Sequence, residues 1–179
     1  MNLTHLTWKD IDTAINSIIL KMYNDNWRPD YIVGIARGGL PLAVMLSHRL
    51  KIPMYGLGIS LRDMVGLESN LWMSEDAYGY VSSHPLVEPT ITNERKQILV
   101  VDDINDTGAT FNWLKDDWQR SCMLDSTNVW DTVWGHNVRF SVIIDNLVSS
   151  FDGVSYCWKE INKAENNEWI VFPWEDTYK

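Results

Sequence analysis

Hydrophobic residues recur along the chain with two spacings, and the spacing predicts where helices and strands lie. Apolar residues between positions 11 and 22 repeat every three or four residues, which predicts a helix over residues 8–23. Residues 31–35 form a continuous apolar run rich in β-branched side chains, which is typical of a buried strand. A turn at residues 37–39 then leads into a second predicted helix over residues 40–50.

The alternation of strand and helix continues through the rest of the chain. It predicts strands at residues 54–60, 97–101, 139–145 and 154–158, a loop at 102–108 and a helix at 109–119. Strands that alternate with helices indicate an α/β fold, with a mostly parallel sheet flanked by helices on both faces. The apolar residues 169–174 are expected to pack back on the same domain.

Residues 61–96 follow no regular period and contain several glycines and prolines. A long segment without a pattern inside a compact domain is usually an active-site cover or a disordered loop. We interpret this segment as a flexible flap that carries a short β-hairpin.

Composition and charge narrow the classes of function. A length of 179 residues fits a single domain over residues 1–179. The formal net charge of −9 argues against binding to nucleic acid, whose phosphates require a basic face. A small phosphorylated substrate fits this charge, because it needs only local positive groups and backbone N–H donors. Most of the ten tryptophans are expected to pack in the core and in interfaces.

The cysteines and the apolar runs of the sequence help to predict the cellular compartment of the protein. Cys122 and Cys157 have neither metal-ligand spacing nor a disulfide framework, so we expect free thiols in a reducing compartment. The N-terminal residues lack the basic and apolar regions of a signal peptide. No apolar run approaches the roughly 18 residues that a membrane helix needs. We therefore expect a cytoplasmic protein that makes no membrane contact.

Residues 98–110 carry most of the chemical information. Four apolar residues precede Asp102 and Asp103, at the carboxyl end of a predicted strand, where ligands bind in open α/β sheets. The next turn opens a helix, so its free N–H groups and the helix dipole favour an anion, to which Thr107 and Thr110 can add hydroxyl donors. Carboxylates can accept from ribose hydroxyls or bind Mg²⁺, which together indicates a phosphorylated sugar. The alternative is an ordinary helix N-terminus capped by Asp106 or Thr107.

This stretch resembles the signature of the type I phosphoribosyltransferases that binds phosphoribosyl pyrophosphate (PRPP). The shared pattern is an apolar strand, two acidic residues, two spacers, Asp-Thr-Gly, and a threonine two positions later. The resemblance implies a Rossmann-like type I phosphoribosyltransferase fold with a flexible flap and a small C-terminal hood at about residues 150–179. It also implies a Mg²⁺-dependent transfer of the 5-phosphoribosyl group from PRPP to a base.

The resemblance assigns roles to the residues of this signature. Asp102 and Asp103 would hold the ribose 2- and 3-hydroxyls, directly or through Mg²⁺. In the purine enzymes, the acid at the position of Asp106 is placed to accept the N7 proton of the base, as a general base. The loop that would wrap the 5-phosphate consists of Asp106, Thr107, Gly108, Ala109 and Thr110.

A second segment, Ala36-Arg37-Gly38-Gly39, resembles the pyrophosphate loop of the same family. Glycines let the backbone approach an anion closely, and Arg37 adds positive charge. A simple strand-to-helix connection is the alternative. The resemblance places a non-proline cis peptide at Arg37–Gly38. It also implies a cation near the flap, for which Arg62 is the candidate, and a solvated loop arginine is the alternative.

Residues 168–175 resemble the C-terminal segment of the xanthine–guanine phosphoribosyltransferases and their relatives. By this resemblance Trp169 would stack on a purine, and the backbone at Ile170 would read the exocyclic substituent. A stacked base gains roughly 1–3 kcal/mol from such an aromatic face. Trp174 is expected to anchor the tail. Asp102 and Asp103 are the expected metal ligands, and Glu175 would help to bind a second Mg²⁺, with a solvated acid as the alternative.

One position departs from the family pattern. The 6-oxopurine enzymes usually carry a lysine just after the fourth strand, where Asn146 stands nearest in this chain. An Asn amide can still donate to a carbonyl. The leading hypothesis is therefore purine salvage from guanine, xanthine or hypoxanthine, with PRPP and a nucleobase as substrates and a nucleoside monophosphate as product. Another base, or a PRPP- or nucleotide-binding regulator without turnover, is the alternative. We expect a homodimer or homotetramer.

Overall fold

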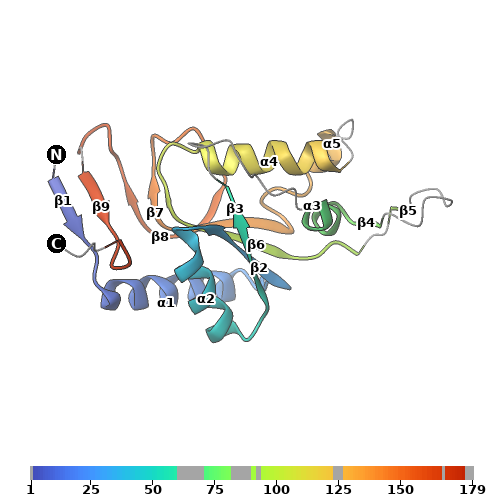
Figure 1. The fold of residues 1–179 in the computed structure, drawn as a ribbon. Coiled ribbons are helices and arrows are strands. Elements are labelled where there is room, and N and C mark those ends of the chain that lie inside the picture. Colours follow the sequence, from blue (N-terminus) through green and yellow to red (C-terminus); the bar gives the residue numbers. More distant parts are fainter. Residues whose placement is uncertain are drawn as a thin grey trace.

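A five-stranded parallel sheet forms the centre of the protein in a computed structural model (Figure 1). The structure describes residues 2–59, 71–81, 90–91, 94–122, 127–166 and 168–175. The strand order is β3-β2-β6-β7-β8, and every neighbouring pair is parallel. The strands are β2 (Tyr31–Ala36), β3 (Met54–Gly58), β6 (Ile98–Asn105), β7 (Val138–Asn146) and β8 (Val154–Ile161).

Helices cover both faces of this sheet, as the sequence predicts (Figure 1). Helices α1 (Trp8–Asn24) and α2 (Gly39–Leu50) lie on one face, whereas α3 (Leu71–Tyr78) and α4 (Ala109–Ser121) lie on the other. A short helix, α5 (Thr127–Trp130), follows α4 in the chain. Alternate residues of β6 enter the two cores: Val100 packs on the α4 side and Val101 on the α2 side.

The polar carboxyl end of β6 differs from the prediction. The sequence predicts a loop from residue 102, but β6 continues to Asn105 and stays paired with β7 as far as Asp145. The reason is that β7 offers backbone partners along this whole length. Hydrogen bonds to β7 therefore keep residues 102–105 in the strand, although hydrophobic burial alone would not do so.

The first and last strands of the described chain pair with each other. Strand β1 (Asn2–His5) runs parallel to β9 (Glu168–Val171), which brings the two ends of the chain together (Figure 1). Leu6 N donates to the Val171 carbonyl oxygen at 2.9 Å. The buried side chains of Ile170 and Phe172 join the core on the α1 side of the sheet. The tail thus packs back on the domain as predicted, whereas β1 was not predicted.

The predicted flap is described only in part. It contains the helix α3, which was not predicted and which buries Met73 and Ala77 in the core. It also contains the strands β4 (Tyr80–Val81) and β5 (Thr90–Ile91), which pair antiparallel as a short hairpin would. Arg62 lies outside the described residues, and the flexibility of the segment stays a prediction.

Several smaller expectations concern the core. Trp118 and Trp130 are fully buried, and Trp134 stacks on Trp130 with ring centroids 5.0 Å apart. These tryptophans pack in the core as predicted. Cys122 and Cys157 are both buried and free. Among the described residues, no helix combines the length and the apolar character needed to cross a membrane.

Candidate active site

The candidate site lies where the chain changes direction across the sheet. From β2 the chain moves outward to β3, whereas from β6 it moves the other way to β7 and β8. Strands β2 and β6 are neighbours, and their carboxyl ends therefore lie side by side. Open α/β sheets bind ligands in the crevice at such a reversal. The two segments that the sequence singles out, residues 36–39 and 102–110, meet at this crevice.

The glycine loop after β2 packs directly against the acidic pair. A Cβ atom on Gly38 would overlap the carboxylate of Asp103. A Cβ atom on Gly39 would overlap the carbonyl oxygen of Val101 and lie 2.9 Å from the Cα of Asp102. The overlap with the backbone requires glycine at position 39, whereas a side chain at position 38 would displace the Asp103 carboxylate. A cis peptide joins Ala36 and Arg37, one bond earlier than the Arg37–Gly38 bond that the resemblance indicates.

Asp102 and Asp103 carry concentrated negative charge at the end of β6. Burial raises the pKa of Asp102 well above its usual range, and the charge of Asp103 raises it further. Burial also raises the pKa of Asp103 to about 6, and Glu175 contributes next. Two of the carboxylate oxygens accept backbone hydrogen bonds, from Asp103 N at 2.9 Å and from Ile104 N at 2.8 Å. The pair would be stabilised by a cation.

The donor set fits Mg²⁺, which prefers oxygen ligands and keeps several waters or substrate oxygens. Glu175 lines the same cleft as Asp102 and Asp103, and its Oε2 accepts a hydrogen bond from Phe172 N at 2.9 Å. Within the described residues, no group of three acidic, His or Cys side chains is close enough to hold a metal by itself. Oxygens of a bound phosphorylated substrate would therefore have to complete the coordination.

Residues 106–110 form a polar pocket of about 230 Å³ at the start of α4. Gly108 occupies the N-cap position with a φ of 84°, so neither Asp106 nor Thr107 is the capping residue. Thr107 Oγ1 accepts from Ala109 N over a long 3.4 Å. The helix start can therefore offer backbone N–H groups and its dipole to an anion.

Side chains that the sequence did not indicate hold this loop in shape. Ser150 donates twice to the Thr107 carbonyl oxygen, from N at 3.0 Å and from Oγ at 2.7 Å. Asn105, one of the two spacers in the signature, donates to Asp145 Oδ1 at 2.8 Å and to the Phe151 carbonyl oxygen at 2.9 Å. Because these contacts span about 40 residues, no local pattern reveals them.

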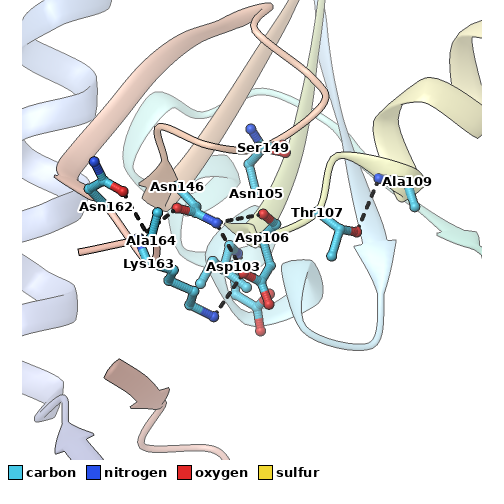
Figure 2. Close-up of polar contacts among 11 residues, drawn as sticks. Asp103, Asn105, Asp106, Thr107, Ala109, Asn146, Ser149, Asn162, Lys163 and Ala164 are labelled. Carbon is cyan, nitrogen blue, oxygen red and sulfur yellow. Dashed lines mark hydrogen bonds and ion pairs between the residues drawn. The ribbon is translucent and has the colours of Figure 1, made fainter. Parts of the chain in front are cut away.

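Both polar atoms of the Asn146 side chain form hydrogen bonds within the protein (Figure 2). Its Nδ2 donates to the Asp106 carbonyl oxygen at 2.8 Å and lies 3.4 Å from Asp106 Oδ1, while its Oδ1 accepts from Lys163 N at 3.2 Å. The side chain is buried. Asn146 thus fastens the end of β7 to the loop after β6 and to the turn after β8. These contacts favour a positioning role over direct donation to a base.

A lysine that the sequence did not indicate lies at this point. Lys163 forms an ion pair with Asp106, with Nζ 2.8 Å from Oδ1, and the same nitrogen lies 5.6 Å from the centre of the Trp169 ring. Trp169 is 49% exposed, as a stacking platform requires, whereas Ile170 is buried in the core. Trp174 stacks on Phe172 with centroids 5.1 Å apart, in line with its expected anchoring role.

A cleft of about 830 Å³ joins the glycine loop, the acidic pair and the C-terminal segment. Its lining residues are Ile35, Ala36, Arg37, Gly38, Pro41, Ile59, Asp102, Asp103, Thr110, Trp174 and Glu175. The cleft shares Asp102, Asp103 and Thr110 with the smaller pocket at the start of α4. The structure thus brings together most of the residues that the sequence indicates, with Asn146, Trp169 and Lys163 beside them.

The chain is similar to known phosphoribosyltransferases in sequence and in structure. The family profile of the phosphoribosyl transferase domain matches residues 6–178. A purine phosphoribosyltransferase from Pyrococcus horikoshii has a similar structure, with a TM-score of 0.63 and 24% identity over 100% of this chain and 97% of that one. The xanthine-guanine-hypoxanthine phosphoribosyltransferase of Helicobacter pylori gives 0.62 and 18% identity, covering 98% of this chain and 95% of its own.

A third similar structure has no enzymatic name. It is a hypothetical protein from Neisseria gonorrhoeae with bound ppGpp, with a TM-score of 0.61 and 18% identity over 99% of this chain and 91% of that one. At these identities the structural matches establish the fold. They confirm the predicted type I phosphoribosyltransferase architecture.

Proposed function

Because this chain belongs to the phosphoribosyl transferase domain family, we propose that it transfers the 5-phosphoribosyl group of PRPP to a purine base of the guanine, xanthine or hypoxanthine class. The products are a nucleoside monophosphate and pyrophosphate. The observation that carries the proposal is the meeting of the glycine loop, the acidic pair and the anion loop at one crevice. These parts correspond to the three polar parts of PRPP: pyrophosphate, ribose hydroxyls and 5-phosphate.

The chain's own groups would bind and orient PRPP. The 5-phosphate would lie at the start of α4, against the N–H groups and hydroxyls of the loop from Asp106 to Thr110. The ribose hydroxyls would donate to Asp102 and Asp103. The pyrophosphate would lie against the backbone of residues 36–39, with Arg37 adding charge.

Mg²⁺ would be held by Asp102 and Asp103 together with oxygens of the substrate, and Glu175, which lines the same cleft, would help to bind a second Mg²⁺. When bound, the ion neutralises charge on the leaving pyrophosphate. The raised pKa values of both aspartates support this assignment, since a neighbouring cation would relieve their repulsion.

The reaction forms a bond from the base nitrogen to the anomeric carbon of the ribose and breaks the bond to pyrophosphate. The base would stack on Trp169, and Asp106 would accept the N7 proton. Asp106 Oδ1 is engaged by Lys163 and by Asn146, which leaves Oδ2 as the oxygen to face the base. The segment over residues 61–96 would exclude water while the ribose carries positive charge.

The purine class is supported by the names of two similar proteins, which act on purine and on xanthine, guanine and hypoxanthine. Their low identity makes the base a matter for experiment. A silent PRPP- or nucleotide-binding protein would keep the same sugar-phosphate site without turnover.

The first prediction concerns activity. Purified protein with PRPP and Mg²⁺ should release pyrophosphate with at least one of guanine, xanthine and hypoxanthine, measured over a panel that includes adenine, uracil and orotate. Asp102→Asn and Asp103→Asn should each lower kcat/KM by about 100-fold or more, because each would remove a charged contact to the ribose or metal. Asp152→Asn, at an exposed position, is the matched control.

Each outcome of this assay separates the candidates. PRPP binding without turnover of any base would support the silent alternative and refute the enzymatic proposal. Turnover that survives both aspartate substitutions in a folded protein would refute the assignment of the site.

A further inference from the structure

We propose that Lys163 selects the base, by donating a hydrogen bond from its ammonium group to a carbonyl oxygen on a purine stacked against Trp169. The same position would reject a purine that carries an amino group there. This inference rests on the proposed function and adds the residue that distinguishes oxopurines from aminopurines.

The ammonium group of Lys163 lies close to both Trp169 and Asp106. Nζ of Lys163 lies 5.6 Å from the centre of the Trp169 ring. The same nitrogen lies 2.8 Å from Asp106 Oδ1, to which it points in Figure 2. The lysine side chain is only 18% exposed, whereas Trp169 is 49% exposed. A flat base that stacks on Trp169 shares this space with the ammonium group. A base stacked on Trp169 would therefore lie next to the ammonium group and could accept a hydrogen bond from it.

Hydrogen bonds within the protein also hold this lysine in place. Its backbone N–H donates to Asn146 Oδ1 at 3.2 Å, and Asn146 in turn donates to the Asp106 carbonyl oxygen at 2.8 Å. The turn after β8 is closed by Asn162, whose Oδ1 accepts from Ala164 N at 3.0 Å and whose Nδ2 donates to Glu165. Because these contacts fix the backbone and the ion pair with Asp106 holds Nζ, the lysine side chain loses little further freedom when a ligand binds.

The donors and acceptors of Lys163 and Asp106 match those of an oxopurine. An ammonium group has three donors and no acceptor, so it stabilises a carbonyl oxygen and cannot satisfy an amino group. Asp106 takes one of the three donors and leaves two for a ligand. A 6-oxopurine carries a carbonyl oxygen next to N7, an acceptor beside a proton to be lost. Lys163 and Asp106 offer a donor beside an acceptor, which is the complementary pair.

The contacts of Asn146 explain why the proposed donor to the base comes from another part of the chain. Nδ2 and Oδ1 of Asn146 are both used within the protein. A donor to the base must therefore come from elsewhere, and Lys163 reaches the same point from 17 residues further along the chain. The lysine that the resemblance leads one to expect after the fourth strand is thus supplied by the turn after β8.

Lys163→Met tests the inference, because it keeps the length of the side chain and removes the donors. At saturating PRPP and Mg²⁺, the variant should lose about 10- to 100-fold in kcat/KM for hypoxanthine, the range expected for one hydrogen bond to a charged group. The kcat/KM for adenine should stay within about threefold, and the KM for PRPP should not change. Lys159→Met, an exposed lysine on β8, should behave as wild type.

A fall of equal size for hypoxanthine and adenine would overturn the inference, because it would mean that Lys163 acts only by holding Asp106. No change in hypoxanthine use would overturn it as well. If the wild-type protein turns over no base, the proposed function fails, and binding of inosine and adenosine monophosphates by calorimetry tests Lys163 alone. Wild type should prefer inosine monophosphate by about 10-fold or more and Lys163→Met should not; equal binding by wild type would refute the inference.

Discussion

Asp102 and Asp103 place two carboxylates in a partly buried position beside Glu175, with little to balance their charge. The pKa of Asp103, about 6, lies above the ordinary value of an aspartate, about 3.9 in an unfolded chain. Between these two values the folded protein binds a proton more readily than the unfolded chain does. The free energy of unfolding should therefore fall as the pH rises from about 4 to 6. At neutral pH the acidic pair destabilises the ligand-free protein.

Asp103→Asn should consequently stabilise the protein while it strongly lowers the proposed activity. In Mg²⁺-free buffer at pH 7, we expect its free energy of unfolding to rise by on the order of 1–3 kcal/mol, since each unit of pKa shift corresponds to about 1.4 kcal/mol. Urea denaturation at pH 4.5, 5.5 and 7 measures the change. The gain should shrink as the pH falls, and Asp152→Asn should show none. An unchanged unfolding midpoint at pH 7 would contradict the expected destabilisation.

Among the secondary-structure elements, helix α4 depends at its start on one glycine, Gly108. Gly108 and Gly135 both have positive φ, 84° and 78°, and both avoid the strain that a side chain would meet there. They differ in their surroundings. A Cβ on Gly108 would lie 2.7 Å from Ser150 Oγ and 2.8 Å from Phe151 Cβ, whereas nothing lies within 4 Å of one on Gly135.

Comparing the two alanine substitutions separates steric overlap from backbone strain. Gly135→Ala should cost about 1–2 kcal/mol of stability, from the left-handed backbone alone. Gly108→Ala should cost roughly 1–3 kcal/mol more, because the loop from Asp106 to Thr110 must move away from Phe151. Urea denaturation measures both values, and PRPP binding should weaken only for Gly108→Ala. Equal costs would mean that the loop can adjust without strain.

The elements that the sequence predicts well are those with a strong local pattern. Helix α1 has regular apolar spacing and a capping box between Thr7 and Asp10, and its predicted end differs by one residue. Helix α3 has only eight residues and becomes a helix because Met73 and Ala77 pack in the core. The end of β6 is a strand because β7 pairs with it. Such tertiary contacts leave no periodic trace in the sequence.

The candidate site also contains residues that a local sequence pattern predicts and residues that only tertiary contacts bring into place. The acidic pair, the glycine loop and the anion loop each consist of consecutive residues, so the sequence pattern of each could be recognised. The structure brings the three segments together. Lys163 could not be recognised, because its closeness to Asp106 arises only when the turn after β8 folds over the end of β7. The role of Arg62 stays a prediction, since this residue lies outside the described part of the chain.

At the scale of the whole molecule, the proposed site combines two parts of different construction. The sugar-phosphate half is built on β2 and β6, in the middle of the five-stranded sheet. The proposed base half includes Trp169 on β9, which belongs to a separate two-stranded sheet with β1. Two short strands alone are only marginally stable, so this pair should open more readily than the central sheet.

Hydrogen exchange tests this difference. Amides of β1 and β9 should exchange together and faster than those of β6 in the ligand-free protein, because each strand depends on the other. Inosine monophosphate should slow exchange in both strands, as binding to Trp169 would stabilise β9. Protection of β9 that is independent of β1 would contradict this coupling. Exchange within β6 in the core should change little, which serves as the internal reference.

The β1–β9 pairing also sets an order of events during synthesis. Thr4 and Glu168, which hydrogen-bond to each other, are 164 residues apart in sequence. A growing chain emerges from the ribosome N-terminus first, at about 5–20 residues per second. The crevice between β2 and β6 can therefore form before β9 has been synthesised and has paired with β1. The platform proposed for the base is completed only when β9 has been synthesised, so the part of the site that is proposed to decide specificity is assembled after the crevice.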